Sequence, residues 1–181
     1  RQALFFKQSP ESLKNLQLVA KIESSESSNR LEGIEIPHKK IEEGEDDLAC
    51  HASIGKTKRT EVMYGAAGHA YVYLIYGMYH CFNVVTERTG YPAAILIRAV
   101  EVDSKNPPAL IDGPGRVCRF FKIDQSLNRL DLTLGHTLWI EDRGERVPDS
   151  KIATSPRIGV DYAGEWAAKP WRFRLKKASS K

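Results

Sequence analysis

The chain has 181 residues, 41% of them hydrophobic, and a formal net charge of +4. This length suits a single domain, and the apolar content is sufficient for a sizeable core. No apolar run reaches membrane-spanning length and the first residues lack the apolar centre of a signal peptide, so we expect a protein that is neither membrane-spanning nor secreted.

The cysteines and histidines argue against disulfide and metal chemistry. Cys50, Cys81 and Cys118 are an odd number without a C-x-x-C pair, and the five histidines show no H-x-x-x-H spacing. A disulfide framework or a zinc site normally needs such pairs. The sequence therefore favours a reducing compartment and predicts no metal site.

The first predicted elements lie in the amino-terminal quarter. "SPESLKNLQLVA" at 9–20 begins with a capping serine and a proline at the first helical position, which predicts a short helix. Residues 38–61 are charged and irregular, and we expect loop there.

The stretch "HAYVYLIYGMYHCFNVV" at 69–85 predicts a β-hairpin. Apolar and aromatic residues alternate with period two on both sides of Tyr76-Gly77, where the turn is expected. A two-residue turn would put Tyr73 and Asn83 on opposite faces, whereas a three-residue turn closed by a left-handed Gly77 would bring them to one face. In the second case Tyr76 would lie exposed at the tip.

A third strand is predicted in "AAILIRAVEV" at 93–102, where nearly continuous apolar content indicates a central position. Arg98 interrupts this run. An arginine there needs a partner because it does not lose its charge. It forms either a structural ion pair or a contact with a ligand in a pocket.

Glycines and basic residues mark the rest of the chain. "DGPGRVCRFFKID" at 112–124 predicts a glycine-rich turn that opens a short helix, which is either an anion-binding turn or a packed connection. Strands are expected in 131–142 and 170–175. In the last one, Trp171 and Phe173 would face the core and Arg172 and Arg174 would form a cationic face. That face is either solubilising or contacts phosphate.

An exposed aromatic ring at a rigid hairpin tip is typical of proteins that insert a wedge into DNA. Flipping a base out of a duplex costs a few kcal/mol, and stacking the flipped base on an aromatic ring returns about 1–3 kcal/mol. Tyr76 is a candidate wedge, and Tyr73 with His51 a candidate platform. Alternatively, these tyrosines belong to the core.

Several stretches together resemble one known family. "DLACHASIGKTKRTEVMYGAAGHAYVYLIYGMYHCFNVVTE", "AAILIRAVE", "GPGRVC" and "RIGVDYAGEWAAKPWRF" closely resemble the alkyladenine (3-methyladenine) DNA glycosylases. The match is dense from Asp46 to Glu101 and ordered up to Phe173. It implies a single glycosylase-like domain over 1–181, matching weakly over 1–45, with a mixed α/β (α+β) fold whose curved antiparallel sheet is flanked by helices and carries a protruding hairpin.

The resemblance also implies roles for individual residues. Tyr76 matches the tyrosine that intercalates into DNA, and Tyr73 and His51 match residues that contact the flipped base. Asn83 matches the asparagine that helps reject guanine, and Arg98 matches the arginine that helps hold the catalytic water.

Three further residues, Met63, Arg59 and Arg116, match positions near the DNA backbone. The implied reaction excises 3-methyladenine, 7-methylguanine or hypoxanthine with an activated water and leaves an abasic site, with no cofactor. The implied partner is double-stranded DNA bound by a monomer. The expected location is the cytoplasm or nucleoid of a bacterium, or the nucleus of a eukaryote.

The chain departs from the family at its general base. The family has E-T-E-A-Y before the histidine matched by His51, with the second glutamate as base and the tyrosine as a stacking wall. This chain has "IPHKKIEEGEDDLACH", where ungapped alignment puts Lys40 at the glutamate. A two-residue gap would instead make Glu42 the base, with Glu43 as second choice.

Three other interpretations stay open. The chain binds damaged DNA without excision; Lys39 or Lys40 attacks the sugar, which the acidic surroundings oppose by raising the lysine pKa; or the tyrosines bind single strands or RNA. The last would need basic residues interleaved with the aromatics, and "AYVYLIYGMY" has none.

Overall fold

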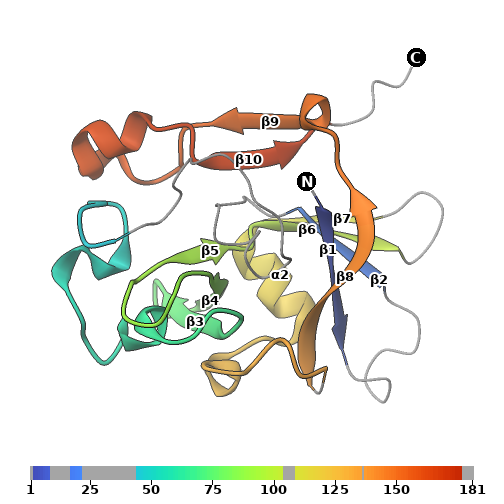
Figure 1. Cartoon of the computed structure of the whole chain (residues 1–181), viewed down its shortest axis with the longest axis horizontal. Coiled ribbons are helices and arrows are strands. Elements are labelled where there is room, and N and C mark those ends of the chain that lie inside the picture. Colours follow the sequence, from blue (N-terminus) through green and yellow to red (C-terminus); the bar gives the residue numbers. More distant parts are fainter. Residues whose placement is uncertain (1, 9–16, 22–43, 104–108, 136, 177–181) are drawn as a thin grey trace.

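The computed structural model describes residues 2–8, 17–21, 44–103, 109–135 and 137–176 (Figure 1). Its strands are β1 (Gln2–Gln8), β2 (Gln17–Lys21), β3 (Ala70–Ile75), β4 (Tyr79–Val85), β5 (Ala94–Leu96), β6 (Ala99–Asp103), β7 (Ala109–Asp112), β8 (Leu138–Arg146), β9 (Ile152–Ser155) and β10 (Arg172–Leu175). Its helices are the α-helix α2 (Pro114–Phe121) and the 3₁₀ helices η1 (His51–Ile54), η2 (Glu61–Tyr64), η3 (Gln125–Leu127), η4 (Asp149–Lys151) and η5 (Asp161–Ala168).

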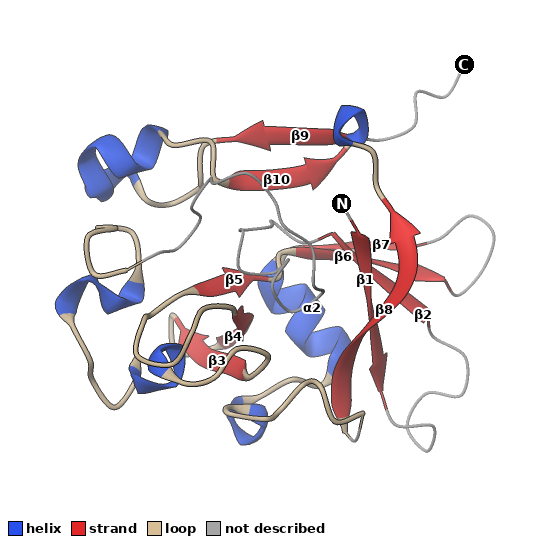
Figure 2. Ribbon diagram, viewed as in Figure 1, coloured by secondary structure: helices blue, strands red, loops and turns tan. Residues whose placement is uncertain are grey.

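These strands form three antiparallel sheets, with the helices between and around them (Figure 2). The largest has the order β7-β6-β2-β1-β8, the second has the order β3-β4-β5, and β9 pairs with β10. The predicted mixed α+β class is confirmed.

The main core lies where α2 packs between the two larger sheets (Figure 1). Val72 of β3, Phe82 of β4, Val100 of β6 and Val117 of α2 belong to one buried cluster there. Because side chains alternate along a strand, the neighbouring residues of β3 and β4 face the other way. This second face carries Tyr71 and Tyr73 of the 69–85 stretch.

The β3–β4 hairpin has a three-residue turn, one of the two turn lengths that the sequence left open. Ile75 pairs with Tyr79 across the turn, and the Met78 amide donates to the Ile75 carbonyl at 3.2 Å. Gly77 is left-handed with φ 67°, and Tyr76 before it is also left-handed with φ 53°. Tyr71 pairs directly with Asn83, so Tyr71, Tyr73 and Asn83 share one face.

The predicted single central strand at 93–102 is wrong. It is two strands, β5 at an edge of the β3-β4-β5 sheet and β6 inside the large sheet. The Ile97 amide still donates to the Phe82 carbonyl of β4. The Arg98 carbonyl instead accepts the Gly113 amide, so pairing with β4 ends there. Arg98 therefore marks the point where the chain passes from one sheet to the other.

The helix predicted at 9–20 is also corrected. Residues 17–20 belong to β2, which pairs with β1 and β6, so strand pairing overrides the local helix signal. The rest of that prediction, 9–16, lies outside the described residues. The irregular stretch is confirmed over 44–61, which holds turns and short 3₁₀ helices. The Gly113 turn and the helix that follows it are confirmed as α2.

Two features are absent from the described residues. No helix there has the length and apolar content that a membrane span requires. No group of three or more histidine, cysteine or acidic side chains in the same part of the chain is arranged to hold a metal ion.

Candidate functional site

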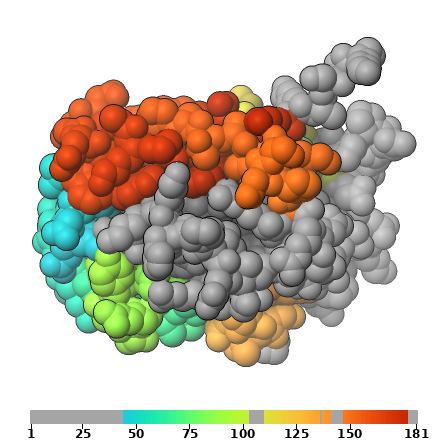
Figure 3. Space-filling view, turned by 45° about the horizontal axis from the view of Figure 1, so that its top comes forward, coloured from blue at the N-terminus to red at the C-terminus, as the bar shows by residue number. Residues whose placement is uncertain are grey.

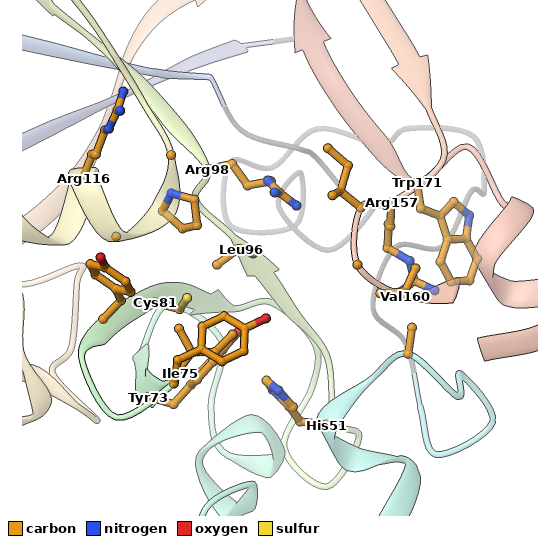
Figure 4. Close-up of a pocket in the computed structure, with 18 of the residues that line it drawn as sticks. His51, Tyr73, Ile75, Cys81, Leu96, Arg98, Arg116, Arg157, Val160 and Trp171 are labelled. Carbon is orange, nitrogen blue, oxygen red and sulfur yellow. The ribbon is translucent and has the colours of Figure 1, made fainter. Parts of the chain in front are cut away.

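A cavity of about 710 Å³ opens between the β3–β4 hairpin, the start of α2 and the segment from β9 to β10. Figure 4 shows Tyr73 and His51 on one side, Arg157 and Trp171 on another, and the Arg98 side chain extending between them. The cavity therefore has an aromatic wall, a cationic wall and a wall supplied by the carboxyl-terminal part of the chain.

The aromatic wall is the corner that the His51 and Tyr73 rings form, and the buried Tyr71 ring packs against both of them. The His51 ring meets the Tyr73 ring edge-on, with 4.5 Å between centroids, and Tyr71 lies 5.3 Å from Tyr73. The Arg59 guanidinium lies 4.9 Å from the Tyr73 ring centroid, a cation–π distance. One face of the Tyr73 ring is therefore next to a cation of the protein itself.

His51 is held in its neutral form. Burial, with a smaller contribution from the Arg59 charge, lowers the pKa of His51 to about 4. The Tyr71 hydroxyl lies 3.3 Å from His51 Nδ1. When Nδ1 accepts this hydroxyl proton, the ring proton is on Nε2, and His51 offers a donor to a ligand.

Tyr76 stands at the rim of the same cavity. Its side chain is 82% exposed, although the backbone is in the left-handed region that bulky residues avoid. Met78 beside it is also exposed. An exposed ring on a strained turn contributes little to folding, and such outliers occur mainly at functional sites.

The cationic wall consists of arginines from several elements. Arg98, Arg116, Arg119 and Arg157 line the cavity, and no aspartate or glutamate is among the described lining residues. Arginines in this number suit a polyanionic ligand, because phosphate contacts dominate nucleic-acid affinity.

Arg157 differs from the other three because its charge is paired inside the protein. Its Nη1 and Nη2 donate to the two carboxylate oxygens of Asp47 at 2.7 and 2.8 Å. Both side chains are buried, at 6% and 0% exposure. Bidentate pairs of this kind fix orientation as well as distance.

One known protein family matches the chain that builds this cavity. The family model described as Methylpurine-DNA glycosylase (MPG) matches residues 42–179, which is most of the chain. This chain belongs to the methylpurine-DNA glycosylase family. The resemblance inferred from the sequence motifs is thereby confirmed.

Relatives of this glycosylase family member are found in bacteria and archaea. A protein of Myxococcus xanthus is 56% identical over 131 residues, which are 72% of this chain and 66% of the relative. One of Methanocella arvoryzae is 52% identical, over 72% of this chain and 70% of the relative. A protein of Legionella pneumophila is 51% identical, over 74% of this chain and 71% of the relative. Each carries the provisional name 3-methyladenine DNA glycosylase, and the chain spans about two thirds of their length.

Five of the residues singled out from the sequence come together around the cavity. They are His51, Tyr73, Tyr76, Arg98 and Arg116. Arg59 is exposed and reaches the same place by covering Tyr73. Glu42, the predicted general base, and Glu43 lie outside the described residues.

Two predicted residues do not lie at the cavity. Asn83 is 2% exposed, is absent from the lining and donates from Nδ2 to the Tyr71 carbonyl at 3.0 Å. It braces the hairpin in this way, and its role in rejecting guanine stays a prediction. Met63 is fully buried in the cluster with Tyr71 and Tyr73. Its side chain has no exposed surface, and its position near the DNA backbone stays a prediction.

The sequence patterns missed the third wall. Arg157 is 110 positions from Asp47, and no short-range spacing links them. Trp171 was expected on a core face, and it is buried at 6%, but it also borders the cavity. The only available signal was the density of family-like residues in "RIGVDYAGEWAAKPWRF".

Proposed function

We propose that the protein is a DNA repair glycosylase that flips alkylated or deaminated purines out of duplex DNA. Its substrates would include 3-methyladenine, 7-methylguanine and hypoxanthine, and the N-glycosidic bond would be hydrolysed by an activated water to leave an abasic site. One copy of the chain suffices for one flipped base, so we propose a monomer acting on chromosomal DNA. No cofactor takes part in this proposal.

The observation that carries the proposal is the position of Tyr76 relative to the aromatic corner. An exposed, strained ring at a hairpin tip borders the cavity that His51 and Tyr73 line. A wedge must lie beside the pocket that receives the base it displaces. The aromatic corner supplies stacking, and His51 supplies a hydrogen-bond donor from Nε2 when its Nδ1 accepts the Tyr71 hydroxyl.

The cavity also fits the charges of the reaction. Arg98 extends into it from the junction of β5 and β6 (Figure 4). A guanidinium there can hold a water or a phosphate oxygen by charge-assisted hydrogen bonds. Alkylated purines carry positive charge, and an electron-rich aromatic ring such as that of Tyr73 favours a cationic base by about 0.5–2 kcal/mol per good contact.

The proposed general base is Glu42, with Glu43 as second choice. A positioned carboxylate that activates water contributes about 10²–10⁴-fold to the rate. It would approach from the segment before Gly44, whose amide donates to the Pro92 carbonyl at 2.9 Å. Glu45, two positions after Glu43, accepts the Tyr64 hydroxyl at 2.7 Å, so the chain after the glutamates is well anchored.

A second candidate function is lesion binding without excision. The observation in its favour is that the family's E-T-E-A-Y motif is missing before His51, where this chain has "IPHKKIEEGEDDLACH". Such a protein would flip and hold the base but leave its bond intact. The two functions share the pocket and differ only in the carboxylate.

The test is incubation with duplex DNA that carries one hypoxanthine or one 3-methyladenine. The proposal predicts release of free base and alkali-labile abasic sites, and Glu42→Gln should reduce the single-turnover rate at least 100-fold while lesion affinity is kept. Tight lesion binding without release would select the second function. A Glu42→Gln variant with unchanged rate would remove Glu42 from the base role and direct attention to Glu43.

A further inference from the structure

The Asp47–Arg157 ion pair joins two walls of the cavity that are far apart in sequence. Figure 3 shows the orange to red surface of the carboxyl-terminal segment beside the cyan surface of the segment that follows residue 44. The pair lies at this junction, buried on both sides. A buried ion pair adds little net stability, and its attested use is to specify one geometry.

On one side, Asp47 organises the turn that presents His51. Its Oδ1 accepts the Ala49 amide at 3.0 Å, and its backbone carbonyl accepts the Cys50 amide at 2.8 Å. The Cys50 thiol then caps the first turn of η1 through the Ala52 amide. The position of the His51 ring therefore follows from the position of Asp47.

On the other side, Arg157 holds the segment between β9 and β10. Its Nη2 donates to the Trp166 carbonyl at 3.3 Å, and its guanidinium lies 5.0 Å from the Trp171 ring centroid. β9 and β10 pair only with each other among the described strands. Ile158, Gly159 and Val160, the three residues after Arg157, line the cavity.

We propose that Asp47 and Arg157 are positioning residues that fix the width of the cavity between its His51–Tyr73 wall and its Trp171 wall. This inference rests on the proposed function and deepens it, because the width decides which purines fit. Removing the pair frees the carboxyl-terminal wall to move outward. Removal of the ion pair should therefore weaken the discrimination between purines of different size.

The test uses Asp47→Asn, Arg157→Met and the double variant. Each single change leaves a buried group of the other charge without its partner, so the melting temperature should fall. The double variant removes both charges and should regain much of the lost melting temperature. It still lacks the bidentate hydrogen bonds that hold the two walls together. A matched control is Glu61→Gln with Arg129→Met, which removes an ion pair that is exposed and outside the cavity lining.

Excision and affinity are compared on two duplexes, one with hypoxanthine and one with 1,N6-ethenoadenine, a purine with an additional ring. In the double variant, the ratio of the hypoxanthine rate to the ethenoadenine rate should change at least tenfold from the wild-type ratio, and the control should keep the wild-type ratio. Arg157→Lys retains the charge but not the bidentate hydrogen bonds. It should shift the ratio of rates to a value between those of the wild type and the double variant. It also provides a folded variant if the others do not fold.

The outcomes separate the positioning role from the glycosylase function. A double variant or Arg157→Lys with native melting behaviour and the wild-type ratio overturns the positioning role and leaves the glycosylase function standing. If wild-type protein binds the lesions but releases no base, the ratio of affinities replaces the ratio of rates. A wild-type protein that binds neither lesion better than undamaged DNA overturns the proposed function, and the size-discrimination role with it.

Discussion

The Tyr76 side chain serves the proposed function but lowers the stability of the fold. A bulky side chain in the left-handed region costs roughly 1–2 kcal/mol, and at 82% exposure the ring recovers little of this by burial. Asparagine tolerates that backbone conformation, whereas alanine does not remove the strain.

We predict that Tyr76→Asn raises the free energy of unfolding by about 1 kcal/mol and weakens lesion binding. The lost stacking of about 1–3 kcal/mol corresponds to roughly 5- to 150-fold in affinity. Tyr76→Ala is the matched control, because it should lose the same affinity without the gain in stability. Denaturant titration and fluorescence anisotropy measure the two quantities. A Tyr76→Asn protein that is less stable than the wild type would show that the ring supports the fold.

His51 predicts a pH dependence of stability. Its folded pKa of about 4 is below the ordinary histidine value of 6.5, so the unfolded chain takes up a proton at a pH where the folded protein does not. The stability contributed by neutral His51 is present above about pH 6.5 and is lost as the pH falls toward 4.

His51→Gln removes this titration, so the difference in unfolding free energy between wild type and variant should change between pH 6.5 and 4 and stay constant from pH 7 to 8. Carboxylates titrate in both proteins and cancel in the difference. Parallel pH profiles would contradict the burial of a neutral imidazole.

At the scale of elements, the hairpin depends on its turn. Gly77 has φ 67°, and no atom lies within 4 Å of the point that a Cβ would occupy, so the only obstacle to a side chain is backbone strain. We predict that Gly77→Ala lowers the free energy of unfolding by about 1 kcal/mol. Gly77→Asn should lose clearly less, because asparagine tolerates this conformation. Equal losses for both variants would show that the side chain meets something other than strain.

The hairpin was also the element that the sequence predicted best. Period-two alternation located both strands, and glycine located the turn, but the pattern alone left two turn lengths open. The break between β5 and β6 was not predictable from composition, since an apolar run looks the same whether it belongs to one buried strand or to two. Arg98 was the visible irregularity, and it proved to be the junction.

At the scale of the whole molecule, the charge is concentrated where the ligand is proposed to bind. The formal net charge is only +4, yet four arginines line one cavity. Three of them, Arg98, Arg116 and Arg119, come from the β5–β6 junction and α2. Each phosphate contact by a cation contributes about one unit to the slope of log affinity against log salt concentration.

We predict that Arg116→Gln and Arg119→Gln each reduce this slope by about one on undamaged duplex DNA. Arg129→Gln is the control, because Arg129 pairs with Glu61 and does not line the cavity. Filter binding or anisotropy between 50 and 200 mM salt, roughly the range over which such contacts are resolved, gives the slopes. Unchanged slopes would mean that DNA does not contact this face of α2.

The sequence could not reveal which residues form the wall opposite Tyr73 and His51. Residue types identified the hairpin wall, since Tyr73 and His51 stand out in their local context. The opposite wall depends on Asp47 meeting Arg157 across 110 positions, a contact that only the tertiary fold creates. Met63 and Asn83 match the family's motif in sequence, and only the fold shows that both side chains are buried.

The central claim is that the cavity receives a base whose place in the duplex is taken by Tyr76. The most direct measurement is the fluorescence of 2-aminopurine placed next to a hypoxanthine in a duplex, which rises when its neighbour leaves the stack. Wild-type protein should produce this rise on the hypoxanthine duplex and not on an undamaged one, and Tyr76→Asn should strongly reduce it. An equal response from damaged and undamaged duplexes, or an undiminished response with Tyr76→Asn, would contradict the account.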